Sequence, residues 1–237
     1  MCNRACIEFG RMVIKDTDIN GKDIIEVGAY DLDGSLRPYV QKLKPKKYVG
    51  IDIAAGPGVD FVADVTNLLN HFNYGSFDMV IATEVLEHVK FWRRAVSTLK
   101  HIIKPGGIVI ITVPSKGCGF HGCPEDHWRY EIEDIKTIFS DFIIEELWKS
   151  PEIEAIFLKA KRPDKLIEFD TSHYKLYSIM KGRRALDNRG VEILFFKIRM
   201  LLRIIRKTPT HIKYLFKGSS IYEVATWVNH PPSSYPT

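Results

Sequence analysis

Short unbroken runs of apolar residues recur along the first two thirds of the chain, with turn-forming residues between them. Their length and their content of Val and Ile are typical of buried strands rather than of helices. The predicted strands are residues 23–27, 47–53, 59–63, 77–83, 108–113, 142–148 and 153–160.

Helical spacing of apolar residues appears between these runs. Leu36, Tyr39, Val40 and Leu43 follow Ser35, a residue type that favours helix starts. Residues 91–103 and 131–139 show the same spacing, and we expect a further short helix in residues 1–20. Strands that alternate with helices predict a mostly parallel α/β sheet, which residues 142–160 close as an antiparallel hairpin.

The first strand–helix–strand unit bears on the type of cofactor. The first strand ends at Gly28, and the second ends on Asp52, where an acidic side chain can accept hydrogen bonds from ribose hydroxyls. A dinucleotide-binding loop needs further glycines after Gly28, but only Gly34 returns, one position late. The bulky Tyr30 and Leu32 would obstruct a pyrophosphate, and the loop also carries two carboxylates that repel phosphate. S-adenosylmethionine, an adenosine with a cationic sulfonium and no phosphate, fits such an acidic loop better.

Five segments in this order resemble the motifs of class I S-adenosylmethionine-dependent methyltransferases. They are residues 26–35, 48–52, 62–64, 77–88 and 99–114. The segment from His121 to Tyr130 is similar to one found in the type 11-like subgroup, and the resemblance covers about residues 23–161. It implies a Rossmann-like sheet of seven mostly parallel strands with a terminal antiparallel hairpin.

The resemblance also implies which residues hold the cofactor: Glu26, Gly28, Tyr30, Asp52, Ile53, Asp64, Val65 and Thr83. Within this set, Asp64 would accept from the adenine amino group, and the backbone N–H of Val65 would reach a ring nitrogen. Asp64 is also a suitable cap for a helix that begins near Thr66, and both roles stay open.

Three side chains are candidates for the catalytic step. His88 follows the fourth strand and titrates near neutrality, so it is the best-placed base for a hydroxyl or amine acceptor. Glu84 and His127 are the other catalytic candidates, and His121 is a rival base. A purely structural His88 is the alternative, and a carboxylate or thiolate acceptor would need no base.

We assign no metal, although two groupings keep one open. The turn with Glu84, Glu87 and His88 is similar to a turn of ubiquinone-biosynthesis O-methyltransferases that can hold a divalent cation. A zinc site can also be drawn, but its spacing matches no common structural pattern. Its residues would be Cys118, His121, Cys123 and His127.

A second group of side chains in the loop at residues 114–129 combines a carboxylate, an aromatic ring and a guanidinium. Asp126, Trp128 and Arg129 either recognise a polar acceptor or tie the loop to the sheet.

Charge separates the chain into two parts. Residues 161–237 contain 15 Lys and Arg against six Asp and Glu, whereas the preceding residues carry a net negative charge. We therefore predict a methyltransferase domain at 1–161 and a basic helical extension at 162–237. Residues 191–207 form a strongly amphipathic pattern, typical of a helix that packs on the catalytic domain or on a homodimer partner, or that binds a membrane surface. Nucleic acid is disfavoured as a partner.

The cysteines and the N-terminal residues bear on the location of the protein, which we predict to be cytoplasmic. The four cysteines occur without an apolar signal segment, which indicates a reducing compartment. We expect a methyltransferase that acts on a small or medium polar acceptor, at oxygen. The alternative is a degenerate cofactor-binding module with a scaffolding or membrane-adaptor role.

Overall fold

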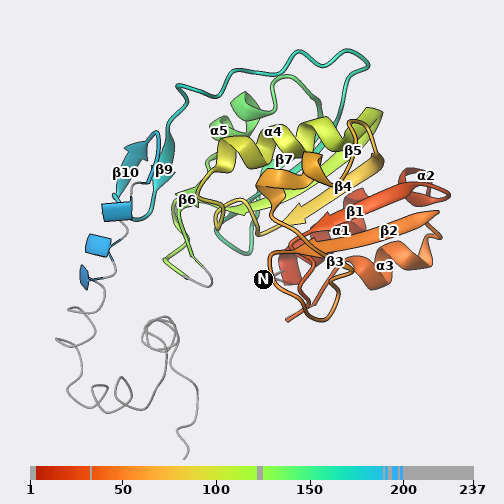
Figure 1. The fold of residues 1–237 in the computed structure, drawn as a ribbon, viewed down its shortest axis with the longest axis horizontal. Coiled ribbons are helices and arrows are strands. Elements are labelled where there is room, and N and C mark those ends of the chain that lie inside the picture. The colour runs from red at the N-terminus through yellow and green to blue at the C-terminus, as the bar shows by residue number, and fades with distance from the viewer. Residues whose placement is uncertain are drawn as a thin grey trace, which may run out of the picture.

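The computed structural model describes residues 4–32, 34–121, 125–188, 190–191, 194–196 and 198–199. Within them, a seven-stranded sheet has the order β3-β2-β1-β4-β5-β8-β7 (Figure 1). Its strands are β1 (Asp23–Val27), β2 (Lys47–Asp52), β3 (Phe61–Val62), β4 (Phe77–Thr83), β5 (Ile103–Pro114), β7 (Ile143–Lys149) and β8 (Ala155–Lys161). β5 pairs with β8, and β8 with β7, in antiparallel fashion, and all other pairs are parallel. The predicted fold class is confirmed.

Both faces of the sheet are covered by helices. α1 (Arg4–Val13), α2 (Asp16–Ile19) and α3 (Arg37–Lys42) share one core with side chains such as Ile24 and Met79. The 3₁₀-helix η1 (Val65–Asn70), α4 (Trp92–Ile102) and α5 (Ile132–Ile138) share the other core with side chains such as Ile25 and Val80. Neighbouring residues of a strand enter opposite cores because side chains alternate across a sheet.

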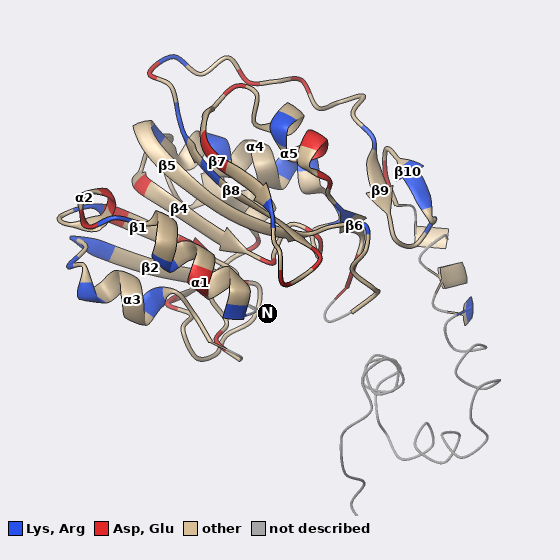
Figure 2. Ribbon diagram, turned by 180° about the vertical axis from the view of Figure 1, so that it is seen from behind, with Lys and Arg blue, Asp and Glu red and all other residues tan. Residues whose placement is uncertain are grey.

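Burial on both faces explains why the strands read as continuous apolar runs. Figure 2 shows β4 and β5 free of charge over most of their length, with charged residues on helices, loops and strand ends. The polar side chains that remain on these strands stand near their ends, as Thr83 and Thr112 do. On these two central strands, polar side chains therefore stand near the ends.

The segment after β8 differs from the helical extension that we predicted. Residues 162–175 cross the molecule, and β9 (Leu176–Ser178) and β10 (Arg183–Ala185) then form a hairpin beside β6 (Trp128–Arg129). Gly182, at φ +64°, lies in the hairpin turn, and Leu176 is fully buried. We call residues 162–188 the strap.

Arg93 of α4 fastens the strap to the domain. Its guanidinium donates hydrogen bonds to the carbonyl oxygens of Thr171 at 2.6 Å, Tyr174 at 2.5 Å and Leu186 at 2.6 Å. These carbonyls belong to irregular backbone that has no ladder partner, so a side-chain donor satisfies them.

The amphipathic helix predicted at 191–207 lies largely outside the described residues. Those described between 190 and 199 are helical, and Leu194, Phe195 and Ile198 are exposed. The membrane or homodimer contact that we predicted therefore concerns a segment that the structure covers only in part. Among the described residues, no helix has the length and apolar content needed to cross a bilayer.

Replacing Arg93 tests how the strap is held. Arg93→Met keeps the aliphatic packing but removes three charge-assisted hydrogen bonds, so we expect a loss of about 2 kcal/mol or more in the free energy of unfolding. Urea denaturation measures it. Arg94→Met is the matched control, because Arg94 is exposed and its guanidinium donates to the side chain of Asn67, its one hydrogen-bond acceptor among the described residues. Equal unfolding midpoints for the two variants would contradict this account of the strap.

Candidate active site

The loop that follows β1 is pressed against the segment that follows β4. Gly28 adopts φ +77°, and a Cβ at this position would lie 2.3 Å from Cγ2 of Val85. Gly58, at φ +83°, would bring a Cβ to 2.3 Å from the carbonyl oxygen of Ala29. Only glycine satisfies both the left-handed backbone and the close approach. The carboxyl ends of β1, β2 and β4 are thereby drawn together.

Glu26 lies beneath this loop and supports it. Its carboxylate is buried and accepts hydrogen bonds from the Tyr48 hydroxyl at 2.6 Å and from Ser35 Oγ at 3.2 Å. Burial raises the pKa of Glu26, while the bonds from Tyr48 and Ser35 act in the opposite direction. Ser35 also accepts from the backbone N–H of Arg37 at the start of α3, so one carboxylate connects the strand to the helix.

Asp52 and Ile53 stand at the carboxyl end of β2, as predicted. Asp52 accepts from the backbone N–H of Tyr30 at 3.3 Å and from that of Ala54 at 3.2 Å. The Tyr30 ring lies over Gly56, where an added Cβ would come within 2.0 Å of it. Ile53 is 60% exposed, which leaves an apolar surface at the strand end.

The remaining predicted cofactor residues follow β3 and β4. Asp64 is exposed and caps η1 by accepting from the Thr66 N–H at 2.7 Å, so the helix-cap role is present. Val65 is buried, and Thr83 is buried as the last residue of β4. All eight residues of the predicted set thus lie on neighbouring strands or on the loops at one end of the sheet.

Glu84 adopts an unexpected conformation. Residues 84–88 form a series of irregular turns, and Glu84 has φ +53°, which is uncommon for a residue with a side chain. Its carboxylate accepts from Thr112 Oγ1 at 3.0 Å and contacts Cys6 Sγ of α1 at 3.8 Å. Burial, and then the neighbouring Glu87 carboxylate, raise the pKa of Glu84 to about 8.

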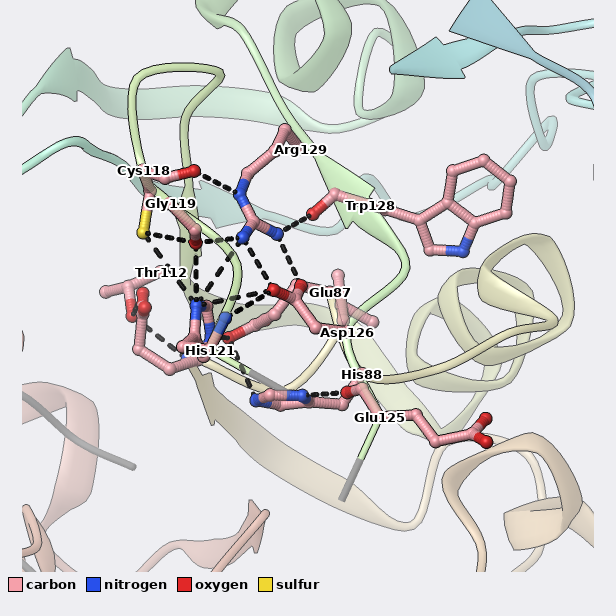
Figure 3. A network of polar contacts seen from close by, with 12 residues as sticks. Glu87, His88, Thr112, Cys118, Gly119, His121, Glu125, Asp126, Trp128 and Arg129 are labelled. Atoms are coloured by element: carbon pink, nitrogen blue, oxygen red, sulfur yellow. Dashed lines mark hydrogen bonds and ion pairs between the residues drawn. The ribbon is translucent and has the colours of Figure 1, made fainter. Parts of the chain in front are cut away.

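Glu87, His88 and His121 form the polar centre of the site (Figure 3). Oε1 of the fully buried Glu87 lies 3.4 Å from Nε2 of His88 and 3.8 Å from Nε2 of His121. The two imidazole rings meet edge to face, with centroids 5.2 Å apart. Burial lowers the pKa of His121, but its bond to Cys118 and the carboxylates of Glu87 and Asp126 raise it to about 10 overall.

Asp126 and Arg129 hold the loop that carries His121. Arg129 is fully buried, and its guanidinium donates to both carboxylate oxygens of Asp126, at 2.5 and 2.7 Å. It also donates to the carbonyl oxygens of Cys118 and Gly119 (Figure 3). Trp128 is buried too, and its indole N–H donates to the carbonyl oxygen of Val89. Of the two roles left open for this set, the structure places these side chains in the one that ties the loop to the sheet.

His127 is not part of the polar centre. It is fully buried, its Nε2 lies 3.0 Å from the Glu125 carboxylate, and Asn188 of the strap lies 3.4 Å from its Nδ1. The zinc grouping is therefore not assembled as drawn, because His127 stands apart from the Cys118–His121 pair. Cys123, its fourth member, lies outside the described residues.

The segment after β4 and the loop after β5 thus bring one buried carboxylate and two imidazoles together. Sequence reasoning did not identify Thr112 and Cys6, which hold Glu84, or the close approach of His121 to Glu87. These contacts join positions far apart in the chain, so no local pattern indicates them.

Comparisons with known proteins agree with this geometry. A family model described as a methyltransferase domain matches residues 8–194. Among solved structures, the 1,6-didemethyltoxoflavin-N1-methyltransferase of Burkholderia thailandensis, with bound S-adenosylhomocysteine, has 14% identity and a TM-score of 0.55, over 68% of this chain and 79% of its own. The [4+2]-cyclase SpnF has 14% identity and a TM-score of 0.53, over 68% of this chain and 81% of its own. A search of curated proteins gave no match.

The close approach at Gly28 can be tested with a matched glycine. Gly21 also has a positive φ, +69°, but nothing lies within 4 Å of an added Cβ. We expect Gly21→Ala to cost about 1–2 kcal/mol for the backbone alone and Gly28→Ala to cost about 1–3 kcal/mol more because of Val85. Urea denaturation of both variants measures the difference.

A double variant separates the clash from general damage. Val85→Ala should restore part of the stability that Gly28→Ala loses, because it removes the methyl group in the way. An additive loss in Gly28→Ala/Val85→Ala would contradict the clash.

Proposed function

The chain belongs to the methyltransferase family, and we propose that within it the protein methylates an oxygen atom of a small or medium polar acceptor. The cofactor is S-adenosylmethionine. The observation that carries the proposal is the imidazole of His88, held beside the buried Glu87 carboxylate after β4. A hydroxyl must lose its proton during methyl transfer, so it needs a nearby base, whereas a thiolate or carboxylate does not.

The chemistry of the sheet edge fits this cofactor. Carboxylates at Asp31, Asp52 and Asp64 favour ribose hydroxyls and a positive charge and disfavour phosphate. The exposed Ile53 offers an apolar contact for the flat adenine ring. We assign the cofactor to the eight residues predicted above, with Asp52 accepting from the ribose and Asp64 and Val65 beside the adenine.

Bound S-adenosylmethionine supplies an electrophilic methyl group and a neutral leaving group. The protein must align the acceptor, exclude water and take up the hydroxyl proton. Nδ1 of His88 faces the carbonyl oxygen of Glu125, which orients the ring, and Nε2 is the atom that accepts the proton. Glu87 stabilises the imidazolium that results.

The other two catalytic candidates take supporting roles in this proposal. Glu84 holds Thr112 at the end of β5 and is fixed by that bond, so we assign it to positioning. His127 faces Glu125 and the strap, which favours a structural role.

A second function rests on the likeness to SpnF, whose description is that of a cyclase. The same fold can serve functions other than methyl transfer. The alternative is therefore a module that binds the cofactor without transferring its methyl group, which we call the non-transferring module. Consumption of S-adenosylmethionine distinguishes the two functions.

Cofactor binding is tested by calorimetric titration with S-adenosylhomocysteine. Asp52→Ala removes an acceptor for the ribose hydroxyls, so we expect binding to weaken by about 1–3 kcal/mol. Asp170→Ala is the control, because this exposed carboxylate bonds only Ser172 among the described residues. Equal affinities would remove Asp52 from the site, and tighter binding of NADH than of S-adenosylhomocysteine would overturn the cofactor.

Methyl transfer is tested with S-adenosylmethionine labelled in its methyl group and pools of hydroxyl, amine and thiol acceptors. We expect labelled product from the hydroxyl pool, and about 10²–10⁴-fold less with His88→Asn at unchanged affinity for S-adenosylhomocysteine. His173→Asn, at an exposed histidine, should keep full activity. Product from amines or thiols alone would refute the choice of oxygen, and no product from any pool would favour the non-transferring module.

A further inference from the structure

The centre of the site contains a buried charge that lacks ordinary hydrogen bonds. The Glu87 side chain is fully buried, and among the described residues no donor forms a hydrogen bond with either of its carboxylate oxygens. Leaving a carboxylate in this state is costly, since burial removes the water that would otherwise solvate it. Nε2 of His88 and Nε2 of His121 are its nearest polar partners, and both face the same oxygen.

Both imidazole rings are oriented by backbone carbonyl groups. Nδ1 of His88 lies against the carbonyl oxygen of Glu125, and Nδ1 of His121 lies 3.3 Å from that of Gly119. A carbonyl oxygen only accepts, so Nδ1 of His88 carries the proton, and in the neutral ring Nε2 presents a lone pair toward the Glu87 carboxylate. A lone pair and a carboxylate repel one another unless a cation lies between them. Nδ1 of His121 also lies 3.5 Å from Nη2 of Arg129, a donor, so the contacts of this ring do not fix its tautomer.

The distances distinguish a proton from a larger cation. A charge-assisted hydrogen bond from an imidazolium to a carboxylate closes to about 2.7–2.9 Å. Here the separations are 3.4 and 3.8 Å, and the three facing atoms lie within 4.8 Å of one another. Oxygen and nitrogen ligands about 2.1 Å from one ion stand roughly 3.0–3.5 Å apart. The separations are too long for two charge-assisted hydrogen bonds. The separation of 3.4 Å matches two ligands of one ion, and that of 3.8 Å would have to shorten by a few tenths of an ångström.

We propose that Glu87, His88 and His121 bind one divalent metal ion of the zinc type. Two imidazoles with one carboxylate suit Zn²⁺ and its first-row neighbours, whereas Mg²⁺ prefers oxygen ligands. Three protein ligands leave a coordination position open, as in catalytic zinc sites. The ligand set differs from the one considered in the sequence, because Glu84 is engaged by Thr112 and His121 takes its place.

The surroundings prepare His121 for this role. Its backbone N–H donates to Asp126 at 2.9 Å, and the pair of Asp126 and Arg129 fixes the loop on both sides of it. Such outer contacts orient metal ligands in advance of binding. The His121 side chain is 32% exposed, so an ion can reach the site from solvent.

The proposed metal site and the proposed methyl transfer share one residue, His88. In the loaded protein, His88 is a ligand instead of the proton acceptor. Metal binding is measured without cofactor or acceptor, so its failure leaves the proposed methyl transfer standing. A failure of methyl transfer likewise leaves the metal site standing.

Cobalt binding tests the proposal directly. The full chain, freed of metal with a chelator, is titrated with Co²⁺, whose visible absorption reports its ligands, and then with Zn²⁺. We expect one Co²⁺ per chain, displaced by Zn²⁺ and not by Mg²⁺. Glu87→Gln and His121→Asn should each weaken binding by at least about 10-fold, the effect that even supporting groups produce. Circular dichroism checks the fold, and His121, whose side chain is partly exposed, provides a variant that leaves the core intact.

Two control variants locate the ion. His173→Asn removes an exposed histidine, and Cys118→Ser removes the thiol 3.9 Å from Nδ1 of His121, so both should retain the full stoichiometry. Absence of stoichiometric binding in the unaltered protein would overturn the proposal. Binding unchanged by His121→Asn, or lost in Cys118→Ser, would also overturn it, because the ion would then have other ligands.

Discussion

A sheet buried on both faces is the constraint on which this molecule depends. Strands β4 and β5 pass between two apolar cores, so a polar side chain in their interiors would have no solvent and few partners. Polar groups are tolerated where the strands end, and there Thr83, Glu84 and Thr112 occur. Because the first five strands in the sheet run parallel, their carboxyl ends meet at one edge, and these polar side chains gather there.

The sequence predicts this edge well because the signals for it are local. Apolar runs bounded by turn residues mark the strands, and a residue placed directly after a strand is thereby placed in space, as Asp52 and Ile53 are. The polar centre could not be predicted in the same way. The left-handed backbone of Glu84 depends on Thr112 and Cys6, and the approach of His121 to Glu87 depends on a loop with little periodicity of its own.

Asp126 and Arg129 show that residue types alone do not determine whether side chains bind a ligand or bind each other. An acid and a guanidinium beside an aromatic ring are as suitable for recognising a ligand as for binding each other. The direction of the side chains decides between these uses, and here both charged groups are fully buried against one another and against loop carbonyls. Removing one member of such a pair leaves the other buried and uncompensated, so they act as a unit.

The strap is synthesised after the main sheet, yet it contacts residues that lie far earlier in the chain. Arg93 and Leu186 bond across 93 residues, and His127 and Asn188 across 61. Closing such long loops is slow relative to local pairing, and a growing chain folds from its N-terminal side first. All seven strands of the main sheet have been synthesised before the strap emerges from the ribosome. The contact between His127 and Asn188 can form only after that, so the loop that carries His127 receives this support later than the strands of the main sheet are made.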